Sequence, residues 1–311
     1  MVNGIVNVYK EKGYTSFDVV AKLRGIFKQK KIGHTGTLDP DAEGVLPVCL
    51  GKATKVCDLL TDKSKEYEAV MLLGVTTDTQ DITGSILEEK AVNVTEAQVR
   101  EAAMSFVGPY QQIPPMYSAL KVNGKKLCDL AREGKTVERK PRPVTIHAIE
   151  IEEIALPRVK MKVFCSKGTY IRTLCQDIGE MLGCGACMET LLRTRVSEFC
   201  VEKAMKLSEI EAYVHRLEHE KSPQEWKVAD FPFIKTVDSV FLQNSKAVVA
   251  HEFEKVLYNG NRLEKNMFLS YETAWEETAV RVYDEKDSFI GIYEFQKQHG
   301  NYKPVKMFIE I

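Results

Sequence analysis

The segment 31–48 constrains this chain more than any other, because it fixes the backbone around one acidic residue. It contains three glycines and two prolines, and Asp39 stands directly before Pro40. Proline disfavours a helical conformation in the residue before it, so Asp39 is held extended. Gly36 and Gly44 permit tight turns on either side. Because Asp before Pro also begins many ordinary turns, the segment predicts a well-fixed loop whose carboxylate is either structural or functional.

The composition is that of an ordinary globular chain without a strong overall charge. The 311 residues are 44% hydrophobic and 28% charged, with a formal net charge of −1. This length suits one large domain and one small domain. No apolar run approaches the roughly 20 residues that a membrane span requires, and the first residues lack the pattern of a signal peptide. We therefore expect a cytoplasmic protein that does not enter a membrane.

Positive charge is concentrated in one part of the chain. Between Lys121 and Pro143 there are eight basic and three acidic residues, a net charge of +5. A near-neutral protein that binds nucleic acid needs such a local patch, although basic surface segments are often merely solvated. Because the segment of about 114–147 also has few apolar positions and two turns with glycine, it is predicted to be an inserted arm.

Capping and periodicity patterns predict both helices and strands. Thr15 and Asp18 form a capping-box pair ahead of an amphipathic helix. Its expected apolar face consists of Phe17, Val20, Leu23 and Phe27. Further helices are expected over 94–107 and 171–182, and strands over 5–9, 67–74, 144–148 and 159–165. In the segment 144–148 the even-numbered residues are expected on the buried face.

The order of these elements excludes one large class of folds. Strands and helices do not alternate regularly, and no G-x-G-x-x-G motif follows a strand. The pattern therefore predicts an α+β fold and not a doubly wound nucleotide-binding fold.

The last quarter of the chain is predicted to be a separate small module. After a polar helix near 207–221, prolines at 223 and 232 indicate a linker. Strands are expected over 279–283, 289–295 and about 305–311. We therefore expect a large domain over 1–230 and a small β-rich domain over 235–311.

The loop around Asp39 resembles the catalytic motif of the TruB family of tRNA pseudouridine synthases. Residues 33–48 read Gly-His-Thr-Gly-Thr-Leu-Asp-Pro-Asp-Ala-Glu-Gly-Val-Leu-Pro-Val, and more than ten of these positions agree with the family motif without a gap. Other segments that resemble the family follow in the same order: Lys10 with 13–16, 51–55, 65–67, 77–81 with Gly84, 113–121, 165–172 and 191–195. The resemblance is strong from residue 4 to about 200 and weak beyond.

The resemblance implies an activity, a substrate and an architecture. The family isomerises uridine 55 in the T loop of tRNA to pseudouridine, without a metal or another cofactor. The implied fold is a catalytic domain on a mixed or antiparallel sheet, with the inserted arm and a small C-terminal PUA-like RNA-binding domain. The implied partner is the T arm of tRNA, and we expect the protein to act as a monomer.

The resemblance also implies roles for five residues of the reaction centre. Asp39 matches the aspartate nucleophile, and both C1′ of the ribose and C6 of the base remain possible points of attack. Arg172 matches the arginine expected to keep that carboxylate ionised against the effect of burial. Tyr67 matches the tyrosine that stacks on the target uracil, whereas Tyr170 and Leu191 match residues that line the base pocket.

Other matching residues are expected to contact RNA outside the base pocket. His34 resembles the histidine that stacks within the distorted T loop once the target base is flipped out. Lys55 is a candidate phosphate contact. Four residues of the arm are candidate contacts to the RNA backbone: Lys125, Lys126, Arg139 and Arg142.

The same residues are compatible with two other functions. A protein with this fold could act as an RNA chaperone with secondary or no catalysis, although the intact set of Asp39, Tyr67 and Arg172 argues against binding alone. A phosphotransferase could use an Asp-x-Asp pair, but no apolar strand precedes Asp39. The lone Cys184-x-x-Cys187 pair and the histidines of the polar helix near 207–221 lack the partners of a metal site, so no metal is expected.

Overall fold

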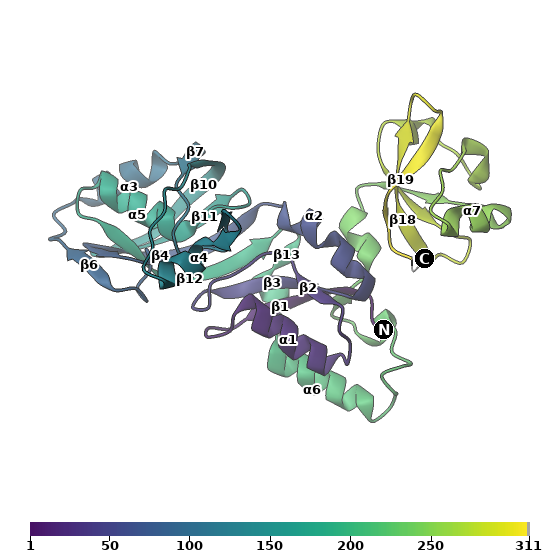
Figure 1. Ribbon diagram of the computed structural model, residues 1–311, viewed down its shortest axis with the longest axis horizontal. Coiled ribbons are helices and arrows are strands. Elements are labelled where there is room, and N and C mark those ends of the chain that lie inside the picture. Colours follow the sequence, from purple (N-terminus) through teal and green to yellow (C-terminus); the bar gives the residue numbers. More distant parts are fainter. Residues whose placement is uncertain (310–311) are drawn as a thin grey trace.

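The computed structural model describes residues 1–309, and its centre is a large mixed β-sheet with helices beside it (Figure 1). The strands follow one another across the sheet in the order β14 (Met205–Lys206), β1 (Gly4–Lys10), β3 (Glu43–Leu50), β12 (Ala186–Val196), β4 (Lys65–Leu73), β11 (Arg158–Cys165), β10 (Arg142–Ala155) and β7 (Gly108–Gln112). Three more strands pair with this path: β2 (Ile32–His34), β13 (Phe199–Cys200) and β15 (Ile234–Lys235). Most neighbours are antiparallel, but β12 runs parallel to β3 and β14 runs parallel to β1. The predicted α+β class with a mixed sheet is confirmed.

Side-chain alternation explains most of the strands. In β4 every second residue, beginning with Lys65 and Tyr67, is buried. The alternation predicted for 144–148 fails at Ala148, which is exposed, because a β-bulge follows Ile146 and turns Ile149 inward instead.

The helices that lie beside the large sheet pack on it through their apolar faces. Helix α1 (Ser16–Ile26) begins at the predicted capping box, in which Thr15 and Asp18 exchange hydrogen bonds. The expected burial of Phe17 is wrong: 62% of its surface is exposed and its ring lies under Arg24. The other helices are α2 (Cys57–Thr61), α3 (Glu96–Met104), α4 (Leu127–Arg132), α5 (Ile171–Met181), α6 (Leu207–Glu218) and α7 (Glu254–Tyr258). Within the part of the chain that the structure describes, no helix is both long enough and apolar enough to cross a bilayer.

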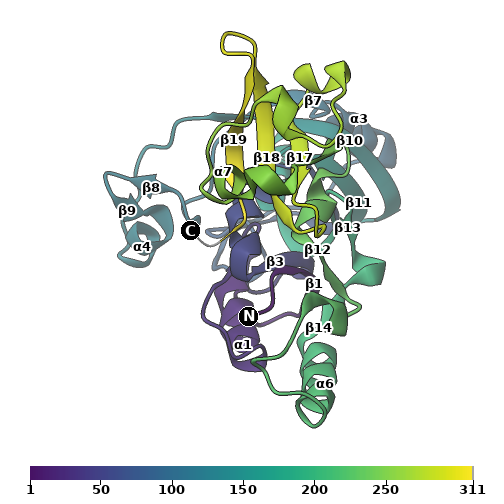
Figure 2. The same ribbon diagram turned by 90° about the vertical axis from the view of Figure 1, so that its right-hand side faces the viewer.

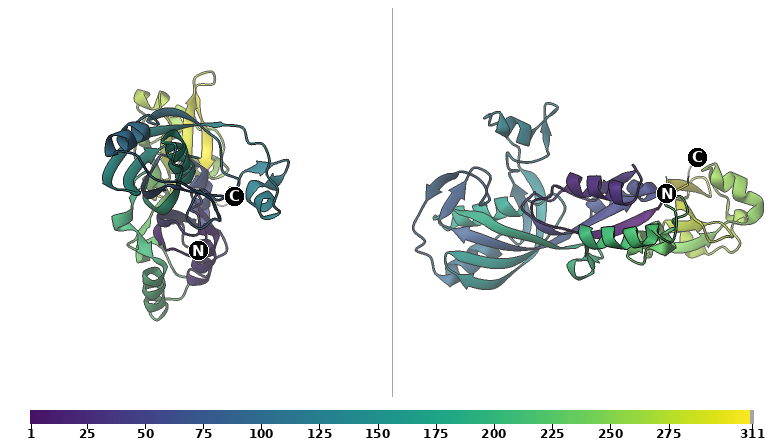
Figure 3. Two further views of the ribbon diagram at one scale, coloured as in Figure 1. Left: turned by 90° about the vertical axis from the view of Figure 1, so that its left-hand side faces the viewer. Right: turned by 90° about the horizontal axis from the view of Figure 1, so that it is seen from below.

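Two hairpins leave the large sheet. The first consists of β5 (Val75–Thr77) and β6 (Ile86–Glu89). The second, between β7 and β10, consists of β8 (Lys121–Val122) and β9 (Lys125–Lys126) and is followed by α4. This second excursion projects away from the body of the protein (Figures 2 and 3). It corresponds to the predicted arm, except that residues 142–147 belong to β10 of the large sheet.

A separate four-stranded sheet lies near the C-terminus, as Figure 1 shows in green and yellow. Its strands are β16 (Ser245–Val248), β17 (Val280–Tyr283), β18 (Phe289–Gln296) and β19 (Asn301–Met307). The residues of this sheet and of the segments beside it form a separate apolar core, which includes Trp275, Tyr293 and Tyr302. The strand expected over 305–311 therefore begins earlier and ends at Met307, and residues 310–311 lie outside the described residues. The division into domains at 230 and 235 stays a prediction.

The backbones of β3 and β12 approach each other closely at Gly44. This residue has φ +104°, and a Cβ atom there would lie 2.2 Å from the carbonyl oxygen of Arg193 on β12. No side chain fits in this space without moving one of the strands. Gly44 therefore sets the distance between the two strands beside the predicted catalytic loop.

Gly44→Ala is expected to lower the free energy of unfolding by at least about 3 kcal/mol, through backbone strain and strand displacement. Chemical denaturation would measure the change. Gly183→Ala is the matched control, because Gly183 also has a positive φ (+76°), but a Cβ atom there would meet no heavy atom of a packed neighbour within 4 Å among the described residues. The control should lose only about 1 kcal/mol, and equal losses in both variants would show that the contact with Arg193 is unimportant.

Candidate active site

The loop that carries Asp39 is fixed by hydrogen bonds to its backbone from distant parts of the chain. The amide of Leu38 donates to the hydroxyl oxygen of Ser16 at 2.9 Å. The carbonyl oxygen of Pro40 accepts a hydrogen bond from the buried ammonium of Lys10 at 3.0 Å. The residues on both sides of Asp39 are therefore held in place, while 39% of the Asp39 side chain stays exposed.

Arg193 anchors the beginning of the same loop from β12. Its guanidinium donates to the carbonyl oxygens of Val45 at 2.8 Å, Gly36 at 3.3 Å and Thr37 at 3.5 Å. Only 1% of Arg193 is exposed. A buried side chain with these contacts links β12 to both β3 and the loop.

Arg172 lies between two carboxylates. It occupies the first turn of α5, and its Nη2 is 3.3 Å from Asp39 Oδ2, while its Nη1 is 3.4 Å from Asp81 Oδ2. Nη2 also donates to the carbonyl oxygen of Tyr117 at 2.6 Å. Only 6% of the Arg172 side chain is exposed, so solvent screens these contacts weakly. The predicted pairing of Asp39 with Arg172 is present in the structure, and Asp81 joins it from the turn between β5 and β6.

The environment raises the pKa of Asp39 above that of an ordinary aspartate. Partial burial has the largest effect, Arg172 lowers the pKa in part, and the neighbouring Asp81 carboxylate raises it again. Arg172 therefore offsets the effect of burial on the pKa of Asp39 only in part. Asp39 is a more basic carboxylate than an exposed one.

The residues predicted to hold the base come together beside this loop. Tyr67 is buried and belongs to the same apolar cluster as Leu38, and Leu191 packs against that cluster. Tyr170 precedes α5, and its backbone exchanges two hydrogen bonds with the side chain of Gln112, at 2.8 and 3.0 Å. Burial raises the pKa of Tyr67, which favours a neutral hydroxyl. Aromatic and aliphatic side chains thus lie next to Asp39.

Two other predicted residues have different surroundings. His34 lies on β2, where its Nδ1 accepts a hydrogen bond from the amide of Gly36, and burial lowers its pKa. A neutral ring, which can stack, is therefore favoured. Lys55, in the 3-10 helix Gly51–Val56, donates from its ammonium to the carbonyl oxygen of Met307 at 2.7 Å, so it is engaged at the contact with the C-terminal sheet.

The four candidates on the arm also differ from one another. Lys125 and Lys126 lie exposed on β9. Arg142 is exposed at the first residue of β10. Arg139 is partly buried and donates to the carbonyl oxygen of Pro114 at 3.1 Å, which closes the base of the arm. Three of the four are thus accessible, and the fourth has a structural contact.

Sequence reasoning gave no role to several residues that shape the site. These are Lys10, Ser16, Asp81, Gln112 and Arg193. All of them except Asp81 are buried polar side chains, and their partners lie far away in the sequence. The segments resembling the family contained four of the five, but nothing in the spacing indicated which carbonyl or carboxylate each would meet.

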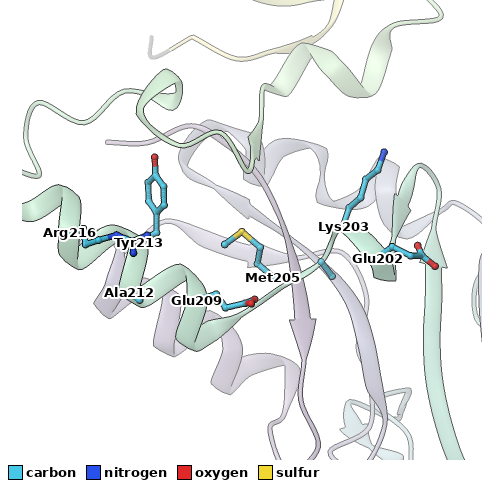
Figure 4. Close-up of a pocket in the computed structure, with 8 residues that line it drawn as sticks. Glu202, Lys203, Met205, Glu209, Ala212, Tyr213 and Arg216 are labelled. Carbon is cyan, nitrogen blue, oxygen red and sulfur yellow. The ribbon is translucent and has the colours of Figure 1, made fainter.

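A hollow of about 500 Å³ lies elsewhere, beside α6 (Figure 4). Its lining consists of Glu202, Lys203, Ala204, Met205, Glu209, Ala212, Tyr213 and Arg216. None of these residues contacts the loop of Asp39. The chemistry of the side chains, and not the size of a cavity, identifies the candidate site.

Asp81→Asn is expected to lower the pKa of Asp39, because it removes a neighbouring negative charge and leaves Arg172 to one carboxylate. Carbon NMR of the carboxyl groups would measure the titration, with Asp39→Asn identifying the signal. Asp78→Asn serves as a control from the same hairpin, where Asp78 accepts a hydrogen bond from the amide of Ser85. An unchanged or higher pKa of Asp39 in Asp81→Asn would contradict this reading of the pair.

The chain is similar to known proteins over nearly its whole length. Residues 24–171 match the model of the TruB family pseudouridylate synthase N-terminal domain, and residues 172–242 match the tRNA pseudouridylate synthase B C-terminal domain. The tRNA pseudouridine synthase B of Lachnoclostridium phytofermentans is 54% identical and that of Alkaliphilus oremlandii 46%, with 99% and 98% of this chain and 100% and 97% of those proteins covered.

A solved structure with a similar fold comes from a Cbf5-Nop10-Gar1 complex. One of its chains is 26% identical with a TM-score of 0.72, over 98% of this chain and 85% of that chain. Sequence and fold agree over nearly the whole length. The chain therefore belongs to the TruB family of pseudouridylate synthases.

Proposed function

We propose that this enzyme converts uridine 55 in the T loop of tRNA to pseudouridine, with Asp39 as the nucleophile. In this reaction the bond from C1′ to N1 of uracil breaks and a bond from C1′ to C5 forms. The proton on C5 leaves, and N1 gains one. Atoms and electrons balance without oxidation or net hydrolysis, so the chemistry requires neither a metal nor an organic cofactor. The relatives named tRNA pseudouridine synthase B support tRNA as the substrate.

The observation that carries this proposal is the pairing of Asp39 with Arg172. A nucleophilic carboxylate must be ionised, and Arg172 at 3.3 Å favours that form. The raised pKa of Asp39 makes its carboxylate a stronger base and hence a better nucleophile. Attack at C1′ and attack at C6 both begin from this ionised group, and both alternatives stay open.

The neighbouring apolar residues are suited to a flipped pyrimidine. Tyr67 and Leu191 offer an aromatic and an aliphatic surface, and Tyr170 is held by Gln112 at the entrance to α5. A uridine within a folded loop must leave the stack before the partly exposed carboxylate of Asp39 can reach it. We assign the vacated position to the neutral ring of His34, which can stack within the T loop.

The arm supports an RNA substrate by its charge. Lys121, Lys125 and Lys126 are exposed on the hairpin β8–β9, which projects from the body (Figure 2). Flexible ammonium groups in such a position can contact phosphates without reading sequence. Lys55 and Arg139, by contrast, already hold backbone carbonyls, and we assign them to structure first.

The expectation that the protein acts as a monomer stays a prediction. Asp39, Tyr67, Tyr170 and Arg172 need no second copy to complete the site. The second candidate function, an RNA chaperone with little catalysis, uses the same RNA surface. The two functions differ in whether pseudouridine forms and in whether its formation depends on the charge of Asp39.

Replacing Lys121, Lys125 and Lys126 with alanine is expected to weaken RNA binding and reduce its salt dependence. Each lost phosphate contact should lower the slope of log K against log salt by about 0.7–0.9. Binding of a T-arm hairpin at several salt concentrations would measure this. The control replaces Lys160 and Lys162, which pair with Glu152 on the sheet. An unchanged slope in the arm variant would show that the arm is merely solvated.

Asp39→Asn is expected to abolish turnover while RNA binding survives. The substitution keeps the size of the side chain but removes the charge and the nucleophile, so pseudouridine formation should fall at least ~10⁴-fold. Affinity for the hairpin should stay within about tenfold, because phosphate and stacking contacts supply most of it. Circular dichroism would check the fold.

Two other outcomes are informative. A folded Asp39→Asn variant that forms pseudouridine at an ordinary rate would refute Asp39 as the nucleophile and with it the proposed mechanism. Loss of binding together with activity would identify Asp39 as a structural residue of the loop.

A further inference from the structure

Arg193 is a buried cation whose hydrogen-bond partners are all neutral. Its three acceptors are the carbonyl oxygens of Gly36, Thr37 and Val45, at 2.8–3.5 Å. Within residues 1–309 no carboxylate forms an ion pair with it, although it is the largest of the fully buried side chains there. A buried guanidinium is usually paired with an acid, so this one requires an explanation.

The nearby acids are occupied by other partners. Glu66, on the adjacent strand β4, accepts hydrogen bonds from Arg195 at 2.9 Å and Thr194 at 3.1 Å. Glu43, on β3, accepts one from Tyr9 at 3.3 Å. The positive charge of Arg193 is therefore left uncompensated in a poorly screened interior, where its effect on other charges is large.

That charge lies between the two proposed parts of the reaction centre. Arg193 is the direct partner of Tyr67 across β12 and β4. Its guanidinium holds residues 36 and 37, and Asp39 follows two residues later. The roles proposed for Asp39, Tyr67 and Arg172 in the reaction do not depend on this charge.

The reaction creates a need for positive charge at this place. When the bond from C1′ to N1 breaks, its electron pair stays with the base, and the detached uracil carries negative charge over N1, O2 and O4. This holds when Asp39 attacks C1′; after attack at C6 that carbon is saturated, and the negative charge that cleavage leaves on N1 is shared with O2. In an apolar pocket such an anion is costly unless a cation or a strong hydrogen-bond donor faces it.

We propose that Arg193 is a positioning residue for the detachment of the base: it holds the loop 36–37 beside the uracil, and its charge, opposite Tyr67 on the neighbouring strand, favours the negative charge of the base through the hydroxyl of Tyr67. The proposal rests on the proposed function. Burial raises the pKa of Tyr67, and the charge of Arg193 offsets part of this rise. The hydroxyl is therefore a stronger donor to an anionic base than it would be without Arg193.

The test compares two substrates with leaving groups of different strength. T-arm hairpins carrying uridine or 5-fluorouridine at the target position are mixed with excess enzyme, and loss of the starting nucleoside is followed after digestion. Fluorine withdraws electrons, so the detached 5-fluorouracil anion depends less on the protein. The variants are Arg193→Met, Arg193→Lys and, as the matched control, Arg195→Met, which removes an exposed arginine from the same strand.

Arg193→Met should slow loss of uridine at least about 100-fold, but loss of 5-fluorouridine at most about tenfold, with hairpin affinity unchanged within about threefold. Arg193→Lys keeps the charge and should recover at least about tenfold of the uridine rate. Arg195→Met should resemble the wild type with both substrates. Equal losses for the two substrates, with no recovery in Arg193→Lys, would overturn the proposal and leave Arg193 as a mere anchor of the loop.

A second neutral variant keeps the test decisive where Arg193→Met fails to fold. Arg193→Gln offers a second neutral variant that can still donate to carbonyls, and it should behave as Arg193→Met does. In the wild type itself the two substrates should react within about tenfold of each other, because the protein already stabilises the anion; a much larger advantage for 5-fluorouridine would overturn the proposal. A wild type that forms no pseudouridine would instead refute the proposed function.

Discussion

The short parallel pairing of β12 with β3 is the constraint on which the site depends. β3 belongs to the part of the large sheet that contains β1 and β2, whereas β12 leads to β4, β11, β10 and β7. The two parts meet where Gly44 lies opposite Arg193. Asp39 comes from the loop before β3, and Tyr67, Arg172 and Asp81 come from the other side of this junction. A small error in the distance between the strands would separate the carboxylate from its partners.

The two buried arginines at this junction have opposite electrostatic surroundings. Arg172 is shared by the carboxylates of Asp39 and Asp81, and burial still raises the pKa of Asp39. Arg193 has only carbonyl partners, so its charge is available to a transient anion. One arginine thus supports the nucleophile, and under our proposal the other supports the leaving base. Arginine suits both positions because it stays protonated when buried.

The parts that surround the site are attached to it in different ways. The arm projects from the strands β7 and β10 and is closed by Arg139 at Pro114 (Figure 3). The C-terminal sheet contacts the body through Lys55 at Met307 and through Lys306, whose ammonium lies 2.8 Å from Asp58. The C-terminal sheet also packs against the body through an apolar cluster that joins Ile5 of β1 with Ile292 and Phe308. The arm has no such apolar attachment among the clusters of the described residues, and polar contacts of this kind permit adjustment to a large ligand such as RNA.

Local sequence determined much of this protein. The capping box at Thr15 began a helix where the pattern predicted, and the alternation in β4 buried Tyr67. The loop around Asp39 was recognisable from glycines, prolines and its resemblance to a family motif. These signals act within a few residues, so they can be read along the chain.

Tertiary structure decided what the sequence could not. Asp39 and Arg172 are 133 positions apart, and Arg172 and Asp81 are 91 apart. The order and spacing of the strands bring the guanidinium of Arg172 to both carboxylates. The same arrangement leaves Arg193 without an ion pair within residues 1–309. The bulge after Ile146, the exposure of Phe17 and the contact of Lys55 with Met307 have the same origin. Long-range packing selects these partners, because the residue types alone allow many others.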